Sequence, residues 1–183
     1  MPTLKVKHRT DPGYYAKTGL QKYHDDDAIP TLINYCFDPK KTDNNLIGGM
    51  AVDVQDAIFE MTALSKAYGK DYGLRLRHMI LAFSPMEVIS MGSCDLDIMQ
   101  SIAEWAISFY GWRYQIVYAI HLDTENPHIH FVMNTTSYLD GTKYHGDMAD
   151  YYGFRDYLEG YTLKYYGFKI ELVSDLIQKK WFE

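Results

Sequence analysis

The sequence predicts an α+β fold in which helices pack against a central, mostly antiparallel sheet of five strands. Segments 113–123 and 128–137 are rich in β-branched and aromatic residues, and a short stretch of turn composition separates them, as in a hairpin. Other segments carry apolar residues at helical spacing. With 183 residues, of which 47% are hydrophobic and 23% charged, we expect residues 1–183 to form a single domain with a sizeable core.

In the first half of the chain, alternating apolar residues indicate strands and apolar residues at helical spacing indicate helices. Pro30 suits the first turn of a helix, and Asp53 can cap the next helix, which Gly69 then ends. The elements expected here are, in order, a strand over 3–9, an irregular segment over 10–27, a helix over 28–37, a strand over 46–52, a helix over 53–68 and a strand over 74–84.

In the second half, glycines mark the ends of two long amphipathic helices, at Gly111 and at Gly167. The elements expected here are a helix over 93–110, strands over 113–123 and 128–137, a tyrosine-rich helix over 147–166 and a last helix over 172–181. No internal repeat or linker interrupts this order, so one layered domain is the simplest arrangement.

The expected hairpin carries a cluster of ionisable residues, because the sequence HLDTENPHIH ends its first strand and begins its second. With a loop over 124–127, Asp123 would face His128 and His121 would face His130. Alternation along both strands would then place all four side chains on one face of the sheet. Opposed Cβ atoms lie roughly 4.5–5.5 Å apart, so three imidazoles could converge on one cation while the carboxylate fixes the tautomer of a ligand.

A cluster of hydrogen-bonded histidines without a metal is the alternative, but it would need a partner for every ring, whereas one cation accounts for them together. Histidine ligands suit Mn, Co, Ni or Zn, while Mg normally prefers oxygen. Three protein ligands leave coordination positions open, as a catalytic metal requires. Such a cation could activate a water molecule or polarise a phosphoryl oxygen, and the hairpin alone does not choose between them.

The formal net charge of −6 argues mildly against a nucleic-acid partner, because phosphate binding favours basic surfaces. Basic residues nevertheless gather locally, at Lys40 and Lys41 and at Arg75 and Arg77, and the 17 tyrosines suit stacking on bases. No apolar run is long enough to cross a membrane, no signal peptide is present, and the two cysteines form no disulfide framework. We therefore expect a cytoplasmic protein.

The histidine motif, His-x-Asp-(x)4-His-x-His followed by FVMN, resembles the HUH signature of conjugative relaxases, most closely the MobP-type and VirD2-like group. The sequence LINYCFDPKKT over 32–42 resembles the tyrosine motif of that family, and RHMILAFSP over 77–85 resembles its middle strand motif. DGTK over 140–143 and KYYGF over 164–168 resemble the end of the relaxase domain, so the similarity spans roughly residues 28–170. The acidic net charge and the long segment before Tyr35 depart from the usual pattern.

The resemblance implies the fold of HUH endonucleases and a bacterial enzyme that nicks single-stranded DNA at an origin of transfer. Tyr35 would attack a phosphodiester and form a 5′-phosphotyrosine, which initiates conjugative transfer or mobilisation of a plasmid or integrative element. His121, His128 and His130 would hold a divalent metal, with Mn or Mg expected in use and Zn, Co or Ni as alternatives. Asp123 would orient His128 or relay the tyrosine proton.

The same resemblance implies partners. These are the hairpin and the single strand of the origin DNA, a relaxosome accessory protein and a coupling protein, with no insertion into the membrane. Four basic side chains are candidate phosphate contacts, with a solvated surface as the alternative for each: Lys40, Lys41, Arg75 and Arg77. His78, on the strand over 74–84, is expected to be structural.

Three other functions remain open on the sequence. An HUH replication initiator or transposase would use a tyrosine downstream of the histidines, and Tyr157, Tyr161 and Tyr165 share one helix face, although core packing also explains that stripe. A metal-dependent hydrolase would activate water and form no covalent intermediate. A DNA-binding module would carry a structural metal. Replacement of Tyr35 and a test for a protein–DNA adduct separate these possibilities.

Overall fold

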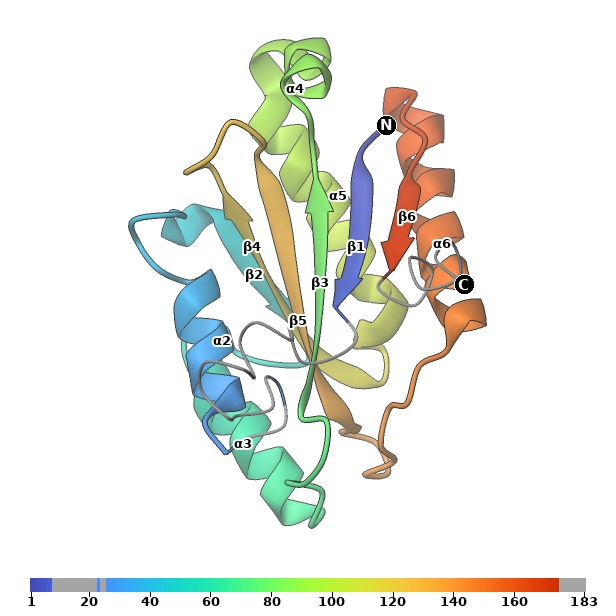
Figure 1. The fold of residues 1–183 in the computed structure, drawn as a ribbon. Helices are drawn as coiled ribbons and strands as arrows, with labels where there is room; N and C mark the ends of the chain where they lie inside the picture. The colour runs from blue at the N-terminus through green and yellow to red at the C-terminus, as the bar shows by residue number, and fades with distance from the viewer. Residues whose placement is uncertain (8–22, 24–25, 175–183) are drawn as a thin grey trace, which may run out of the picture.

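The computed structural model describes residues 1–7, 23 and 26–174 (Figure 1). In these residues six strands form one sheet in the order β2-β4-β5-β3-β1-β6, and every neighbouring pair is antiparallel except β1–β6. The strands are β1 (Thr3–Lys7), β2 (Ile47–Met50), β3 (Leu76–Ala82), β4 (Tyr114–His121), β5 (His128–Ser137) and β6 (Glu171–Ser174). The α+β class and the mostly antiparallel sheet are confirmed, but the sheet has one strand more than the five predicted.

The additional strand, β6, lies where the last helix was expected to begin. Leu172 pairs with Leu4 of β1, and the backbone N–H of Glu171 donates to the carbonyl oxygen of Pro2 at 3.0 Å. The helix prediction was wrong here because local apolar spacing says nothing about the free edge of β1, whose unpaired backbone groups accept a further strand. Residues 175–181 of that predicted helix, and most of the segment expected to be irregular, lie outside the described residues.

Helices cover both faces of the sheet (Figure 1). α2 (Ala28–Cys36) and α3 (Ala57–Ala67) pack on one face, and α5 (Asp95–Gly111) and α6 (Met148–Tyr166) on the other. Short helical turns complete the described chain: η1 (Asn44–Leu46), α4 (Pro85–Met91) and η2 (Gly92–Cys94).

Helix α4 was not predicted from the sequence, although Ser84 and Glu87 have the spacing of a capping box, which marks the start of a helix. The Glu87 carboxylate accepts hydrogen bonds from the backbone N–H and the hydroxyl of Ser84 at 2.7 and 2.8 Å. Pro85 then occupies the first turn, where its missing N–H costs nothing.

Each face of the sheet has its own apolar core, because successive side chains of a strand point to opposite faces. Met79, Ile116 and Phe131 belong to the core under α5 and α6. Leu76 and Val132 belong to the smaller core under α2 and α3. Each histidine of β3, β4 and β5 is separated by an even number of residues from a member of this second core in the same strand. The histidines therefore lie on the same side of the sheet as α2: His78, His121, His128 and His130.

The register of the β4–β5 hairpin differs from the prediction by two residues. His121 pairs with His128, and Ala119 pairs with His130, so the loop spans 122–127 rather than 124–127. The cause lies elsewhere in the fold: the backbone N–H of Leu122 donates to the carbonyl oxygen of Lys41 at 3.1 Å, which takes Leu122 out of the hairpin ladder. Because the shift is even, the histidines keep their common face.

Candidate metal centre

Three histidines meet at the loop end of the β4–β5 hairpin, on the face covered by α2. His121, His128 and His130 each place one ring nitrogen within 4.8 Å of the ring nitrogens of the other two. The centroid of the His130 ring lies 4.3 Å from that of His121 and 4.8 Å from that of His128. His121 and His130 are buried and His128 is half-buried, so the cluster opens toward solvent on the side of His128.

One nitrogen of each ring is already engaged in a hydrogen bond. Nε2 of His121 lies 2.7 Å from the carbonyl oxygen of Cys36, and Nδ1 of His128 lies 3.0 Å from that of Asn126. These bonds place the proton on the engaged nitrogen and leave the lone pair on the other one.

The remaining nitrogens fit metal ligation. Nδ1 of His121 and Nε2 of His130 are buried, and neither has a hydrogen-bond partner among the described residues. Buried nitrogens without a partner are costly, and a cation between them satisfies both. Burial lowers the pKa of both rings, and the neighbouring imidazoles lower it further, so both stay neutral, which is the form that binds a metal.

Behind His130 lies a second buried histidine, His78 of β3. Its Nε2 is 2.7 Å from Nδ1 of His130, and its Nδ1 is 2.9 Å from the hydroxyl of Tyr23. If His130 offers its Nε2 lone pair to a cation, its Nδ1–H donates to His78, and His78 in turn donates to Tyr23. In that arrangement His78 fixes the tautomer of His130, a role not predicted from the sequence because local sequence does not reveal that β3 pairs with β5.

Tyr35 reaches the same cluster from the last turn of α2. Its ring centroid lies 5.6 Å from that of His130 and 5.9 Å from that of His121. The side chain is 47% exposed, so a substrate can reach it. Lys41 places its ammonium nitrogen 3.6 Å from the centroid of the Tyr35 ring, a cation–π contact. Because the next residue, Cys36, bonds His121 through its carbonyl oxygen, the end of α2 is fixed to the histidines.

A family model described as relaxase, MobA/VirD2-like, nuclease domain, matches residues 35–166, well over half of the chain. The chain belongs to this family. Its relaxases bind and nick DNA and generally use a divalent metal ion, so the protein is a DNA-nicking enzyme of the relaxase class. The matched segment begins at Tyr35 and contains all three histidines.

Other comparisons add little to the relaxase assignment. No curated protein matches the chain. A solved structure titled "Molecular Basis of Vancomycin Resistance Transfer in Staphylococcus aureus" is similar at 14% sequence identity and a TM-score of 0.44, covering 70% of this chain and 73% of that one. In the described part of the relaxase, no helix has the length and apolarity needed to cross a bilayer.

Asp123 does not occupy the position predicted for it. It lies in the exposed loop after β4, and no hydrogen bond joins it to His121, His128 or His130 in the described part of the relaxase. The carbonyl oxygen of Asn126 takes the place opposite Nδ1 of His128. The two-residue shift of the hairpin explains the difference, because it moves Asp123 out of β4.

The four predicted phosphate contacts separate into different regions of the relaxase. Lys41 lies over Tyr35, and Lys40 is exposed beside it. Arg75 forms an ion pair with Asp26 at 2.5 Å. Arg77 is 3% exposed on the opposite face from His78, so the structure does not bring it to the histidines.

The buried Arg77 serves the core under α6 instead. Its guanidinium lies over the rings of Tyr144 and Tyr151, with 5.6 and 5.5 Å to the ring centroids, and donates to the carbonyl oxygen of His145 at 3.3 Å. Arg77 is next to His78 in β3, and the alternation of the strand places these two side chains on opposite faces.

The downstream tyrosines of α6 lie on the far side of the sheet from the histidines. Tyr157 and Tyr161 stack against Trp105 of α5, with ring centroids 5.0 and 4.8 Å apart. Tyr165 packs on Tyr161 at 4.9 Å. The stripe is thus explained by packing between α5 and α6.

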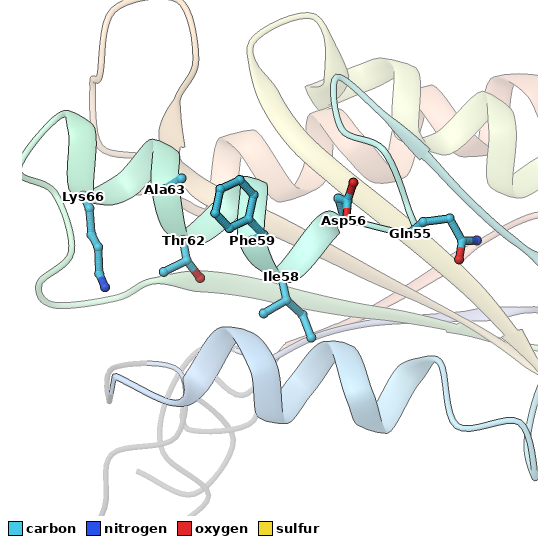
Figure 2. Close-up of a pocket in the computed structure, with 7 residues that line it drawn as sticks. All are labelled: Gln55, Asp56, Ile58, Phe59, Thr62, Ala63 and Lys66. Carbon is cyan, nitrogen blue, oxygen red and sulfur yellow. The ribbon is translucent and has the colours of Figure 1, made fainter.

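A hollow of about 520 Å³ lies elsewhere, beside α3 (Figure 2). Its lining comes from α3 and the turn before it: Gln55, Asp56, Ile58, Phe59, Thr62, Ala63 and Lys66. The set contains no histidine or cysteine, and Figure 2 shows its side chains spread along α3 and the turn before it. The histidine cluster therefore remains the candidate centre on its chemistry.

Proposed function

We propose that the protein is a site- and strand-specific nicking and strand-transfer enzyme for single-stranded DNA, with Tyr35 as nucleophile at an origin of transfer. The observation that carries the proposal is the contact of Tyr35 with His121 and His130, whose buried nitrogens converge with His128 and have no hydrogen-bond partner within the part of the chain that the structure describes. Nicking would initiate conjugative transfer or mobilisation of a plasmid or integrative element.

In the proposed reaction the Tyr35 oxygen forms a bond to phosphorus while the bond from phosphorus to the 3′ oxygen breaks. The phenol loses its proton and the leaving 3′ oxygen takes one up, so the products are a 5′-phosphotyrosine and a 3′-hydroxyl. Because one phosphoester replaces another, the 3′-hydroxyl can later attack the adduct and rejoin a strand. A phenol has a pKa of about 10, so its attack needs positive charge nearby.

Positive charge comes from two sources at this site. A divalent cation held by His121, His128 and His130 would polarise the scissile phosphate and offset its growing negative charge. Lys41 places an ammonium group beside the Tyr35 ring, where it would stabilise the negative charge of the phosphate. Asp123 lies in the exposed loop after β4. Its proposed role is to relay the proton of Tyr35 rather than to orient His128.

The family also supports the remaining parts of the proposal. The DNA partner would be an origin hairpin with its single strand, and a relaxosome accessory protein and a coupling protein would complete the assembly in the bacterial cytoplasm. We propose Mn or Mg as the metal in use, and a single relaxase domain over residues 1–183. Lys40 and Arg75 remain proposed DNA contacts.

The test is covalent capture. Tiled single-stranded oligonucleotides from the DNA element that encodes the protein are incubated with the protein and Mn²⁺, and denaturing gels detect an adduct. Mass spectrometry of the adduct should place the nucleotide on Tyr35. Cleavage without an adduct would instead favour a hydrolase that activates water, and an adduct on Tyr157, Tyr161 or Tyr165 would favour the initiator type.

Replacing Lys41 with alanine should slow adduct formation by about tenfold to a hundredfold, because one cation is lost from the transition state. Single-turnover rates at saturating DNA measure the effect. Lys40→Ala is the matched control, since it removes the same charge one residue away from the Tyr35 contact. Equal rates in the two variants would contradict a specific role for Lys41.

Replacing His78 with alanine should lower the affinity for Mn²⁺ by about 10- to 100-fold, because His130 loses the partner that fixes its ring. Titration calorimetry measures the affinity for Mn²⁺ without DNA. The melting temperature shows whether the cavity left by the smaller side chain destabilises the fold. His78→Gln keeps a carbonyl acceptor near Nδ1 of His130 and should recover part of the affinity. Wild-type affinity in the alanine variant would rule out the positioning role.

A further inference from the structure

Cys36, the residue after the proposed nucleophile, belongs to a second group of metal-ligating atoms. Its sulfur and one ring nitrogen each of His78 and His130 lie within 4.8 Å of one another. The three residues are 1%, 4% and 2% exposed. This group shares His130 with the metal centre, but it is closed to solvent and contains a thiol, whereas the centre is open and contains imidazoles alone.

The two groups suit different cations. A thiolate with two imidazoles selects thiophilic metals such as Zn²⁺, which takes sulfur at about 2.3 Å and imidazole nitrogen at about 2.0 Å. Nε2 of His78 and Nδ1 of His130 are 2.7 Å apart. Tetrahedral ligation would separate such nitrogens to about 3.3 Å, a change that small rotations of the two rings can supply.

His130 cannot serve both groups at once. A neutral imidazole has a proton on one nitrogen and a lone pair on the other. In the open centre His130 offers Nε2 and donates its Nδ1–H to His78. Nδ1 is the nitrogen of His130 that faces Nε2 of His78, so a cation held with Cys36 and His78 would take Nδ1 and leave the proton on Nε2, the nitrogen that the open centre needs.

We propose that Cys36, His78 and His130 form a second, inhibitory site for a thiophilic divalent cation, which competes with the open centre for His130. On binding, the Cys36 thiol releases its proton to solvent, the His130 proton moves from Nδ1 to Nε2, and the cation replaces the His130–His78 hydrogen bond. Zinc would then inactivate the enzyme by withdrawing one ligand. The inhibitory consequence rests on the proposed function, whereas the site itself does not.

Cobalt(II) is the spectroscopic probe, because a thiolate ligand gives it a charge-transfer band that imidazoles do not. We expect the band in the wild type, in Cys94→Ser and in His128→Ala, which removes a ligand of the open centre only. We expect the band to be lost in Cys36→Ser and in Cys36→Ala, two substitutions that differ in packing. Circular dichroism would verify that both variants fold. Absence of the band in the wild type, or its persistence in both Cys36 variants, would overturn the site.

Competition is tested by zinc inhibition of Mn²⁺-supported nicking, with each variant compared with its own zinc-free rate. Cys36→Ala should need at least about tenfold more zinc for half-inhibition, and Cys94→Ser should behave as the wild type. Equal zinc sensitivity of Cys36→Ala and the wild type would overturn the competition. A protein that never nicks DNA would count against the proposed function, while the cobalt spectra would still decide the site.

Discussion

Tyr35→Phe should lower the rate of nicking by at least about a thousandfold and abolish the covalent protein–DNA adduct, because the variant lacks the oxygen that attacks phosphorus. The variant should fold normally. Tyr35 is 47% exposed, and loss of one half-exposed hydroxyl changes the free energy of unfolding by no more than about 0.5 kcal/mol. DNA affinity should also persist, since the aromatic ring remains for stacking.

Denaturing gels and a filter-binding assay on the same oligonucleotide separate these two effects. Tyr161→Phe is the control, because Tyr161 is the middle member of the rival stripe and packs on Trp105 on the far side of the sheet. It should nick at the wild-type rate. If Tyr35→Phe still forms the adduct while Tyr161→Phe does not, the nucleophile belongs to α6 and the enzyme works as an initiator.

The hairpin illustrates how much of the site the sequence could predict. Spacing alone placed His121, His128 and His130 on one face, and the structure brings them together although the predicted register was two residues off. The prediction survived because an even shift keeps a face, whereas an odd one would have scattered the ligands. The prediction for Asp123 was wrong, because the same shift moved this residue from the strand into the loop.

Other features depend on contacts between distant segments, which local patterns do not contain. The pairing of β3 with β5 brings His78 to His130, and the free edge of β1 makes a strand of Glu171–Ser174. Net charge was also a poor guide: at −6 it argued mildly against nucleic acid, yet the family binds DNA. A sum over the chain conceals the local placement of a cation such as Lys41 beside Tyr35.

His128→Ala should lower the rate of nicking at low metal concentration by at least about a hundredfold, because His128 is the half-buried member of the proposed metal centre. His128 is also the most informative ligand to remove. His130 is 2% exposed and bonds His78, so its loss would disturb the core as well as the metal. His121 is buried and holds the end of α2 through Cys36.

The decisive pattern is a separation of metal affinity from DNA affinity. Calorimetry should show Mn²⁺ binding weakened by at least about a hundredfold, because even a lost outer partner of a ligand costs about 10- to 100-fold. DNA affinity should stay within about threefold, since it comes mainly from phosphate contacts and stacking away from His128. His145→Ala is the matched control, as His145 is exposed and absent from both ligand groups. Wild-type nicking by His128→Ala in the presence of a chelator would contradict the proposed role of a metal held by these histidines.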